Sequence, residues 1–441
     1  METAAWATRR ERLVVIGGGQ AAAQMIEVAR RKGYEGRITL VTEEAMLPYQ
    51  RPPLSKQYLT GQYAPDWLLY RPEEFYGKFE VDVRLAQRAA AIERVDRVVR
   101  LQDGGALAYD KLALATGARA RVLAVPGAAS EKVFYIRTLA DVERLRPQLP
   151  LLRKVVIIGA GFIGLEAAAM LVQRGIAVTL IGAGAQLIPR LVGGEMAAFL
   201  LDQHLLHGVK VVLRAEVREL RAAPGGLIEV NLGDGRGFAG DAVLVGIGAA
   251  PNTELAEEAG LHCENGIIVD EMARTSDPAI VAAGDCTNHP NALVGRRLRL
   301  ETVHNAVEQG RSAGATIAGC DLPYAQSPWV WSDQYKFRLQ SVGIADGYDR
   351  TILRGTPASG RFSLFYYRGD DLLALNSINE PLVFGAVRRI LNQRIPLRAE
   401  MAADTGFDLA RLPARKVNLN FDEPWPDKAA TRGMAVSWGF S

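Results

Sequence analysis

Short apolar runs alternate with helix-like stretches along the first part of the chain. Residues 13–16 form one such run, and it leads through the turn 17–22 (GGGQAA) into an alanine-rich helical pattern that ends near Lys32. A second apolar run follows at residues 38–42. Apolar runs that are too short for a helix and are bounded by glycine are typical of buried parallel strands. The pattern therefore predicts a strand–turn–helix–strand unit at the start of the chain.

The same order returns about 140 residues later. The run 155–158 meets the turn 159–164 (GAGFIG), a helical pattern follows, and the run 177–181 closes the unit. In such a turn the first glycine permits the bend, the second lets a pyrophosphate approach, and the third lets the helix pack on the strand. Free N–H groups at the helix start bind phosphate. Both turns therefore predict dinucleotide sites, formed by Gly17, Gly19, Gln20, Ala21 and Ala22 and by Gly159, Gly161, Ile163 and Gly164.

Two dinucleotide folds in one chain suggest one bound flavin, as FAD, and one exchanging nicotinamide coenzyme. The nicotinamide would deliver hydride to the flavin, and the flavin could release the electrons singly. The task of the protein would then be alignment, because the cofactors supply the chemistry. The absence of any nucleophile–base constellation in the sequence agrees with this interpretation.

The order of the remaining runs predicts how the domains are connected. Residues 275–285 carry the chain back toward the first fold, so that fold is split and the second is inserted in it. Short β-like runs from residue 326 and a helical pattern at 381–391 indicate a third domain. We predict an α/β fold of glutathione-reductase-like architecture: two Rossmann-like dinucleotide-binding domains and a C-terminal α+β domain. The expected segments are 1–122 and 248–325 (FAD), 123–247 (NAD(P)H), 326–412 (α+β interface domain) and 413–441 (extended tail).

Composition excludes several other classes of protein. The 441 residues carry 52 basic and 49 acidic side chains, and a net charge of +3 is too balanced to imply nucleic-acid binding. No apolar run approaches the roughly 20 residues of a membrane helix, and the start of the chain offers no cleavable apolar segment, which favours a cytoplasmic protein.

The cysteines are Cys263, Cys286 and Cys320, none in a CxxC pair. Disulfide reduction and a metal site are therefore not expected.

Several further motifs carry a family resemblance over roughly residues 11–412. They are RPPLSK at 51–56, LALATG at 112–117, AGD at 283–285, ETV at 301–303 and PWVWSDQY at 328–335. With the two glycine turns, they resemble the FAD-dependent ferredoxin reductases of bacterial oxygenase systems. The resemblance implies electron transfer from NAD(P)H through FAD to a 2Fe-2S ferredoxin that serves a cytochrome P450 or a ring-hydroxylating Rieske oxygenase. We expect a monomer or a weak homodimer.

Two other functions stay open at this point. One is a redox-sensing or binding flavoprotein of the apoptosis-inducing-factor kind, and the other is a reductase for rubredoxin or for nitrite reductase. The absence of an organelle-targeting segment weighs against the first.

The resemblance also implies roles for individual residues. Lys56 would lie beside the isoalloxazine, and Glu166 would face Lys56 and help to seat the nicotinamide carboxamide. Glu166 could instead be a first-turn acid that complements the helix dipole, and Asp285 a helix N-cap. The other implied cofactor contacts are Glu43, Arg51, Ala89, Thr116, Gly117, Arg137, Gly182, Arg190, Gly248, Gly284, Asp285, Glu301, Thr302, Val303 and Trp331. His304 is expected to be a neutral, packed imidazole. For Trp329, core packing alone is as good an interpretation as a role at the site.

The residue after the second strand distinguishes the two nucleotide units. Glu43 lies about 20 residues beyond the first turn, suited to accept hydrogen bonds from a ribose diol. Gly182 occupies the matching place in the second unit, and Ala183 and Gly184 supply no carboxylate. Arg190 is the nearest arginine in that stretch. We expect NADH as the exchanging coenzyme, with NADPH as an open alternative.

Acidic ferredoxins require a basic surface for docking. The resemblance implies such a surface around the flavin exit, and the candidates are Arg296, Arg297, Arg299, Arg311 and Lys336. A merely solvated basic surface is the alternative.

Overall fold

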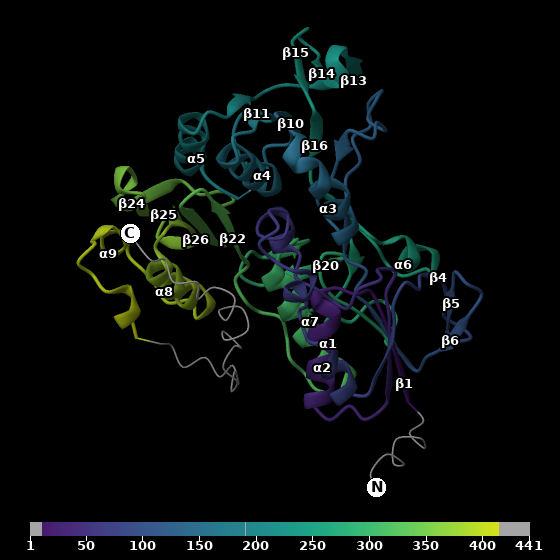
Figure 1. Ribbon diagram of the computed structural model, residues 1–441. Coiled ribbons are helices and arrows are strands. Elements are labelled where there is room, and N and C mark those ends of the chain that lie inside the picture. The colour runs from purple at the N-terminus through teal and green to yellow at the C-terminus, as the bar shows by residue number, and fades with distance from the viewer. Residues whose placement is uncertain (1–10, 190, 414–441) are drawn as a thin grey trace.

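The computed structural model describes residues 11–189 and 191–413. A five-stranded parallel sheet lies in the lower part of Figure 1, in the order β19-β7-β1-β2-β3. Strand β19 comes from residues far along the chain and pairs with β7. The split of the first nucleotide fold is thereby confirmed. The strands are β1 (Arg12–Ile16), β2 (Arg37–Val41), β3 (Val81–Arg84), β7 (Lys111–Leu114) and β19 (Ile280–Ala282).

A second five-stranded parallel sheet lies above the first in Figure 1, in the order β12-β11-β10-β16-β9. Its central strands are buried on both faces, which explains why they appear in the sequence as continuous apolar runs. The strands are β9 (Val133–Phe134), β10 (Lys154–Ile158), β11 (Ala177–Ile181), β12 (Lys210–Val212) and β16 (Ala242–Val245). Helices α1 (Gln20–Arg31) and α4 (Phe162–Gln173) follow the glycine turns.

The chain passes from the first fold to the second and later returns. The two connecting segments pair as short antiparallel strands, β8 (Ala118–Ala120) and β17 (Ala249–Pro251). Each nucleotide fold also carries a three-stranded antiparallel sheet on its outer side, and most of these strands were not predicted. They are β4 (Ala89–Glu93), β5 (Val98–Leu101) and β6 (Ala106–Ala108), and β13 (Val217–Ala223), β14 (Leu227–Leu232) and β15 (Gly237–Gly240).

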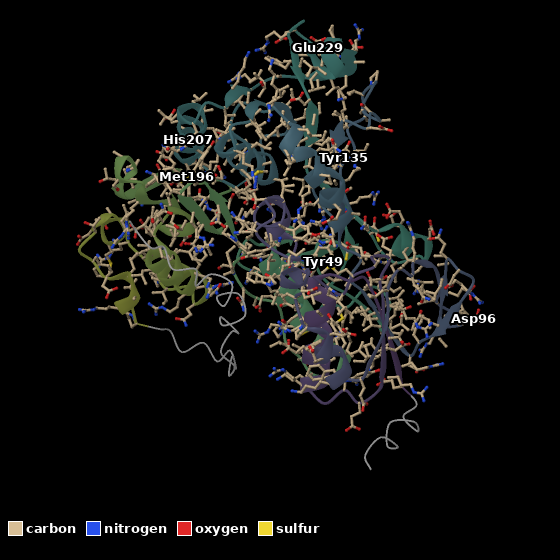
Figure 2. All side chains as sticks on the ribbon, viewed as in Figure 1. Tyr49, Asp96, Tyr135, Met196, His207 and Glu229 are labelled. Carbon is tan, nitrogen blue, oxygen red and sulfur yellow. The ribbon has the colours of Figure 1, made fainter. Side chains whose placement is uncertain are left out.

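The C-terminal domain is a five-stranded antiparallel sheet in the order β22-β23-β26-β25-β24. Phe199 of helix α5 (Gly194–Leu206) packs edge-on against Phe337 and Phe362 of this sheet. In Figure 2, Met196 and His207 lie on the side of the second fold that faces this domain. Its elements are β22 (Trp329–Gln334), β23 (Phe337–Gly343), β24 (Arg350–Thr356), β25 (Arg361–Arg368), β26 (Asp371–Ile378), α8 (Pro381–Asn392) and α9 (Ala399–Ala403). The sequence missed β24.

Helix α7 (Val303–Ile317) packs along α1 in the first fold (Figure 1). A side chain at Gly310 would come within 2.7 Å of the Ala21 carbonyl oxygen, so the small residue permits the close approach. No helix within the described ranges is long and apolar enough to span a bilayer. The other elements are α2 (Glu73–Lys78), α3 (Leu139–Leu145), α6 (Glu254–Glu258), β18 (Ile267–Ile268), β20 (Thr287–Asn291), β21 (Arg296–Leu298), η2 (Pro52–Ser55), η3 (Pro65–Leu68), η4 (Arg146–Leu151), η5 (Pro224–Gly226), η6 (Pro357–Ser359) and η7 (Leu409–Arg411).

Candidate active site

The two glycine turns have nearly the same geometry. Gly17 and Gly159 adopt φ angles of +114° and +117°, which only glycine adopts readily. A Cβ at these positions would lie 2.1 Å from the Ala115 carbonyl oxygen and 2.2 Å from the Gly246 carbonyl oxygen, respectively. Each turn therefore lies directly against the strand beside it.

Both turns leave room for a phosphate. A Cβ at Gly19 would meet nothing within 4 Å, and one at Gly161 would only reach the Gly246 oxygen at 4.0 Å. These glycines are the N-caps of α1 and α4, and neither has a side-chain cap, so the first N–H groups of each helix are available to an anion. Gln20, Ala21 and Ala22 begin α1, and Ile163 and Gly164 belong to the first turn of α4. The residues present fit the pyrophosphates of FAD and of a nicotinamide dinucleotide.

The ends of the second strands differ. Glu43 follows β2 with its side chain 62% exposed and 3.6 Å from Arg88. At Gly182 an added Cβ would lie 2.9 Å from Leu213 and 3.0 Å from Ala160. The sequence analysis overlooked Arg214, whose backbone N–H donates to the Gly184 carbonyl at 2.9 Å and whose side chain is exposed. Arg190 lies outside the described residues.

Lys56 and Glu166 form a buried ion pair. Lys56 Nζ lies 3.1 Å from Glu166 Oε1, and their side chains are 13% and 8% exposed. Lys56 also reaches Asp333 Oδ2 at 3.3 Å. The hydroxyl groups of Ser55 and Ser332 donate to the two oxygens of Glu166 at 2.9 and 2.7 Å. Helix α4 has no acidic residue in its first turn, so the interpretation of Glu166 as a first-turn acid that complements the helix dipole is wrong. Glu166 instead accepts from donors that the FAD fold and β22 supply.

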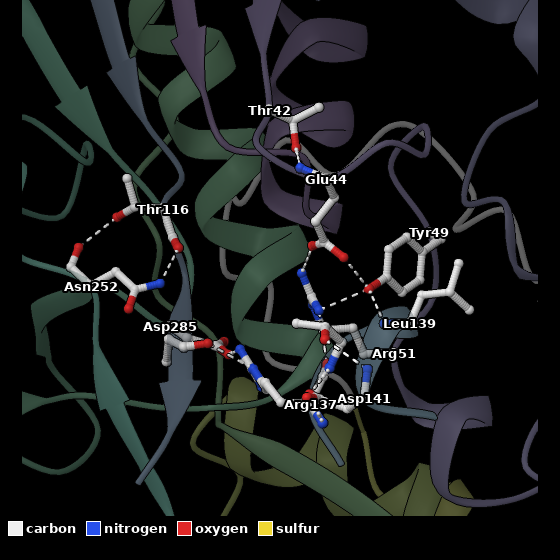
Figure 3. A network of polar contacts seen from close by, with 12 residues as sticks. Thr42, Glu44, Tyr49, Arg51, Thr116, Arg137, Leu139, Asp141, Asn252 and Asp285 are labelled. Atoms are coloured by element: carbon white, nitrogen blue, oxygen red, sulfur yellow. Dashed lines mark hydrogen bonds and ion pairs between the residues drawn. The ribbon is translucent and has the colours of Figure 1, made fainter. Parts of the chain in front are cut away.

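A second polar network lies beyond the carboxyl ends of β2 and β19 (Figure 3). Arg51 donates to Glu44 at 2.6 Å and to the Arg137 carbonyl at 2.8 Å. Although burial disfavours the charged form of Arg51, the neighbouring Tyr49 and Glu44 favour it, and the Arg51 pKa is raised. Arg137 in turn donates to Asp285 at 2.6 Å. Arg51 therefore connects the loop 48–56 to the backbone at Arg137. Glu44 and Tyr49 were not among the predicted site residues, although Tyr49 lies in the loop 48–56 and Glu44 shortly before it.

Thr116 and Gly117 end the strand that lies beside the first glycine turn. Asn252 donates to the Thr116 carbonyl at 2.8 Å, and Thr116 donates back to the Asn252 carbonyl at 2.7 Å (Figure 3). This reciprocal pair joins the two crossings between the nucleotide folds. Gly248 adopts φ +100° beside the same crossing, and its carbonyl accepts from Arg121 at 2.9 Å. Gly248 therefore lies in the connection between the folds.

The start of α7 approaches the same region from the first fold. Thr302 caps α7 by accepting from the Asn305 N–H at 3.1 Å, and Val303 is the first helical residue. Glu301 is bound to Arg299 at 2.5 Å. Gly284 donates to Gln309 of α7 at 2.8 Å. Asp285 is paired with Arg137 and caps none of the described helices, so its N-cap interpretation is wrong.

The two tryptophans of β22 lie close together. Their ring centres are 5.6 Å apart, and the Lys56 ammonium lies 6.0 Å from the Trp331 ring. Trp329 contacts Phe384 and His304 at 5.7 and 5.4 Å. Burial lowers the His304 pKa to about 4, so its imidazole is neutral. Ala89 begins β4, away from this cluster.

The five predicted docking residues come from β21 and the residue that follows it, from α7 and from the β22–β23 hairpin, and most of them bind within the chain. Arg296 pairs with Asp346, and Arg297 donates to the Asn288 carbonyl at 2.6 Å. The Arg299 side chain is only 9% exposed. Arg311 lies 4.0 Å from Glu308, and Lys336 is exposed. The basic surface is therefore less open than the sequence suggested.

The cysteines do not form a redox pair among the described residues. All three are free thiols, and Cys286, which directly follows Asp285, is buried. Burial raises the pKa of Cys286 and raises that of Cys263 to about 11. A buried thiol with a raised pKa is a poor nucleophile, which agrees with the expected absence of disulfide chemistry.

Comparison with known proteins places this geometry in a family. The pyridine nucleotide-disulphide oxidoreductase model matches residues 11–310, and the reductase C-terminal model matches residues 329–413. Rhodocoxin reductase of Rhodococcus erythropolis is 41% identical over 93% of this chain and 96% of its own length. The crystal structure of the ferredoxin reductase for the CYP199A2 system from Rhodopseudomonas palustris superposes with a TM-score of 0.88 at 39% identity, covering 91% of this chain and 99% of that one.

The reductase in the covalent putidaredoxin reductase–putidaredoxin complex also superposes with a TM-score of 0.88, at 36% identity over 92% of this chain and 98% of that chain. The predicted fold class is confirmed. The chain belongs to the pyridine nucleotide-disulphide oxidoreductase family, whose members are FAD-dependent enzymes that use NAD(P)H, and within that family it is one of the ferredoxin reductases.

Proposed function

We propose that this enzyme carries electrons from NADH through FAD to a 2Fe-2S ferredoxin that serves a cytochrome P450 or a ring-hydroxylating oxygenase. The Lys56–Glu166 pair is the observation that carries the proposal, because donors from the FAD fold and from β22 meet there on a helix of the second nucleotide fold. When bound, FAD takes up two electrons from NADH and passes them on one at a time.

The residues around this pair have a positioning task. The turn at Gly17 holds the FAD pyrophosphate, and the turn at Gly159 holds that of NADH. Lys56 and Glu166 hold the nicotinamide carboxamide, and their burial excludes water from the junction between the two ring systems. Arg51 and Arg137 keep the neighbouring loop and crossing in place. Fixed alignment of this kind accelerates transfer without any proton donor of the protein.

The ferredoxin docks beside β22 in this proposal. Trp331 lies next to Lys56 and marks the side of the site that is nearest the C-terminal domain. Lys336, in the turn after β22, and Arg388 are both exposed, and the Arg388 guanidinium lies 5.7 Å from the ring of Trp329 at the start of β22. These two cations are better candidates for steering than Arg297 or Arg299, which are bound within the chain. Steering by surface charge weakens as salt screens it.

The test is a reduction experiment followed by a panel of acceptors. Anaerobic titration with NADH should bleach the flavin, and NADPH should do so with lower efficiency. Cytochrome c reduction should then require an added 2Fe-2S ferredoxin, and 0.5 M salt should lower its rate about tenfold. Fast bleaching with no gain from any ferredoxin would contradict the proposed acceptor. Rubredoxin belongs in the panel, because rubredoxin-NAD(+) reductase of Pseudomonas putida is 36% identical to this chain.

We further propose that the enzyme works in the cytoplasm. The free state of all three cysteines is what a reducing compartment maintains. Activity in the cytoplasmic fraction of the source cells, with little in the periplasmic or membrane fractions, would support the assignment.

A further inference from the structure

A row of buried hydrogen bonds joins helix α5 to Glu166. His204 of α5 is fully buried and lies 3.0 Å from Gln334 Oε1. Gln334 Nε2 donates to Ser332 Oγ at 3.1 Å, and Ser332 donates to Glu166 Oε1 at 2.7 Å. At the other end, the Tyr335 hydroxyl lies 2.8 Å from His204 Nδ1. The row connects two helices of the second nucleotide fold through a strand of the C-terminal domain.

The direction of every donor in this row follows from its last member. Glu166 accepts from Lys56, so it is a carboxylate, and the single hydrogen of Ser332 is committed to it. The Ser332 oxygen must then accept from the amide nitrogen of Gln334, which turns the amide oxygen toward His204. His204 must therefore carry its hydrogen on Nε2 and accept from Tyr335 at Nδ1. Burial lowers the His204 pKa to about 4, in agreement with this neutral form.

Tyr335 reaches its place with an unfavourable backbone. Its φ angle is +55°, in the left-handed region that a bulky residue seldom adopts. The ring stacks on His207 with centroids 3.8 Å apart and planes 15° from parallel. His207 lies at the face of α5 that meets the C-terminal domain (Figure 2). Tyr335 begins the two-residue loop between β22 and β23, where a tight hairpin turn requires a positive φ, and from this position its hydroxyl reaches His204.

Several charged groups share the far end of the row. Lys56 lies between Glu166 and Asp333, at 3.1 and 3.3 Å, and Arg338 holds the other oxygen of Asp333 at 2.9 Å. Ser55 fixes Glu166 Oε2 at 2.9 Å. The Ser332 bond therefore sets the rotation of the carboxylate about its last torsion. That rotation determines whether Oε1 faces Lys56, or whether Lys56 is paired with Asp333 alone.

We propose that His204 is a positioning residue for coenzyme binding: through Gln334 and Ser332 it holds the Glu166 carboxylate in the orientation that keeps Lys56 at the nicotinamide site. This inference rests on the role proposed above for Lys56 and Glu166. It assigns a function to a buried histidine that no part of the nucleotide motifs includes.

Two substitutions at His204 separate its two hydrogen bonds. In His204→Gln the amide nitrogen replaces Nε2 and keeps a donor toward Gln334. In His204→Asn the side chain reaches only the position of Nδ1, so the donor is lost. We expect the dissociation constant of NAD+ for the oxidised holoenzyme, measured by flavin absorbance, to rise about tenfold in His204→Asn and less than about threefold in His204→Gln. His262→Asn, at an exposed histidine, is the matched control and should leave it unchanged.

A double-mutant cycle shows whether His204 acts through Glu166. Glu166→Gln alone should raise the dissociation constant of NAD+ at least as much as His204→Asn does. The double variant should bind NAD+ no more weakly than Glu166→Gln, because the chain would have nothing left to orient. Thermal unfolding of each holoenzyme verifies that the variants are folded at the temperature of the titration.

Each other outcome overturns the inference in a recognisable way. If Glu166→Gln weakens NAD+ and His204→Asn does not, or if the two effects add, the positioning role fails while the proposed function stands. Equal weakening by His204→Asn and His204→Gln would show that packing and not the donor chain matters. If Glu166→Gln has no effect, the role proposed for the Lys56–Glu166 pair fails and the inference fails with it.

Discussion

The two nucleotide folds of this chain are alike at the turn and different at the end of the second strand. Gly17 and Gly159 have φ angles within a few degrees of each other, and each turn lies against a neighbouring carbonyl. Beyond β2 the chain presents Glu43, whereas beyond β11 it presents Gly182 with Arg214 beside the loop. The comparison teaches that the glycine turn defines the class of ligand, a dinucleotide. We expect the residues at the strand end to determine which dinucleotide is accepted.

The largest effects are expected at the turns. Alanine at Gly17 or Gly159 would combine a left-handed φ with a Cβ only 2.1 or 2.2 Å from a carbonyl oxygen. We expect each variant to lose roughly 2–4 kcal/mol of unfolding free energy. We expect Gly17→Ala to retain little flavin after purification, whereas Gly159→Ala should keep its flavin and bind NAD+ more weakly. The ratio of flavin to protein absorbance and an NAD+ titration measure the two losses.

Gly33→Ala is the control for backbone strain alone. Its φ is +91°, but an added Cβ meets nothing within 4 Å. It should lower stability by about 1 kcal/mol and leave both cofactors bound. Loss of flavin from Gly159→Ala with retained NAD+ affinity would contradict the assignment of the two folds.

The next effect concerns the residue that connects the folds. Lys56→Met removes one partner of a buried ion pair and leaves the Glu166 carboxylate without its cation. We expect a loss of about 3 kcal/mol in stability and a roughly 100-fold slower reduction of the flavin by NADH. Lys111→Met, which removes a more exposed pair with Glu11 and a hydrogen bond to the Ile317 carbonyl, should cost about 1–2 kcal/mol and leave flavin reduction unchanged. Stopped-flow absorbance measures the reduction rate, and an unchanged rate in Lys56→Met would disprove the role given to Lys56.

A smaller effect is expected in coenzyme preference. Arg214 has φ +54° and lies beside the loop 182–184, where a 2′-phosphate would be placed. Arg214→Gly should lower kcat/KM for NADPH about tenfold, the effect of one charge-assisted bond, with little change for NADH. It should also raise the unfolding free energy by up to about 1 kcal/mol, because glycine accepts the left-handed backbone. A parallel loss with both coenzymes would show that Arg214 supports the loop and does not recognise the phosphate.

The sequence predicted the parts of this molecule that depend on local patterns. Both glycine turns, the parallel strands around them and the helix at 381–392 are evident from periodicity and from residues with special backbone requirements. The outer strands such as β13 and β24 have mixed burial and no clear alternation, so their pairing depends on tertiary contacts that a local pattern does not contain. Domain boundaries and most residue roles stay predictions.

The candidate site shows the same division. The pairing of Lys56 with Glu166 followed from the family resemblance, and the structure places the two side chains together. His204 and Arg214 lie in segments without a recognisable motif. Arg214 lies beside the loop 182–184 because β12 pairs with β11, and His204 is linked to Glu166 only through two residues of β22. Conversely, Arg297 and Arg299 appear in the sequence as free charges, whereas carbonyl and carboxylate partners from other segments bind them in the fold.

The last comparison is pH-dependent and concerns a buried histidine from each fold. Burial lowers the pKa of both His289 and His204 to about 4 from an ordinary value of 6.5, so each is neutral in the native state. The unfolded chain therefore binds more protons between pH 6.5 and 4, and the stability present above pH 6.5 is lost as the pH falls through that range. Each histidine should cost about 1–2 kcal/mol between pH 7 and pH 5.

The two histidines differ in their partners, and that difference is testable. Among the residues that the structure describes, neither ring nitrogen of His289 has a hydrogen-bond partner, whereas both nitrogens of His204 do. His289→Phe should therefore be neutral or slightly stabilising at pH 7 and clearly stabilising at pH 5, since it removes an unpaired polar ring and its proton uptake. His204→Phe should destabilise by about 2 kcal/mol at pH 7, and this deficit should shrink toward pH 5. Urea unfolding at the two pH values measures both, and an equal response of the two variants would mean that the His204 bonds contribute no net stability.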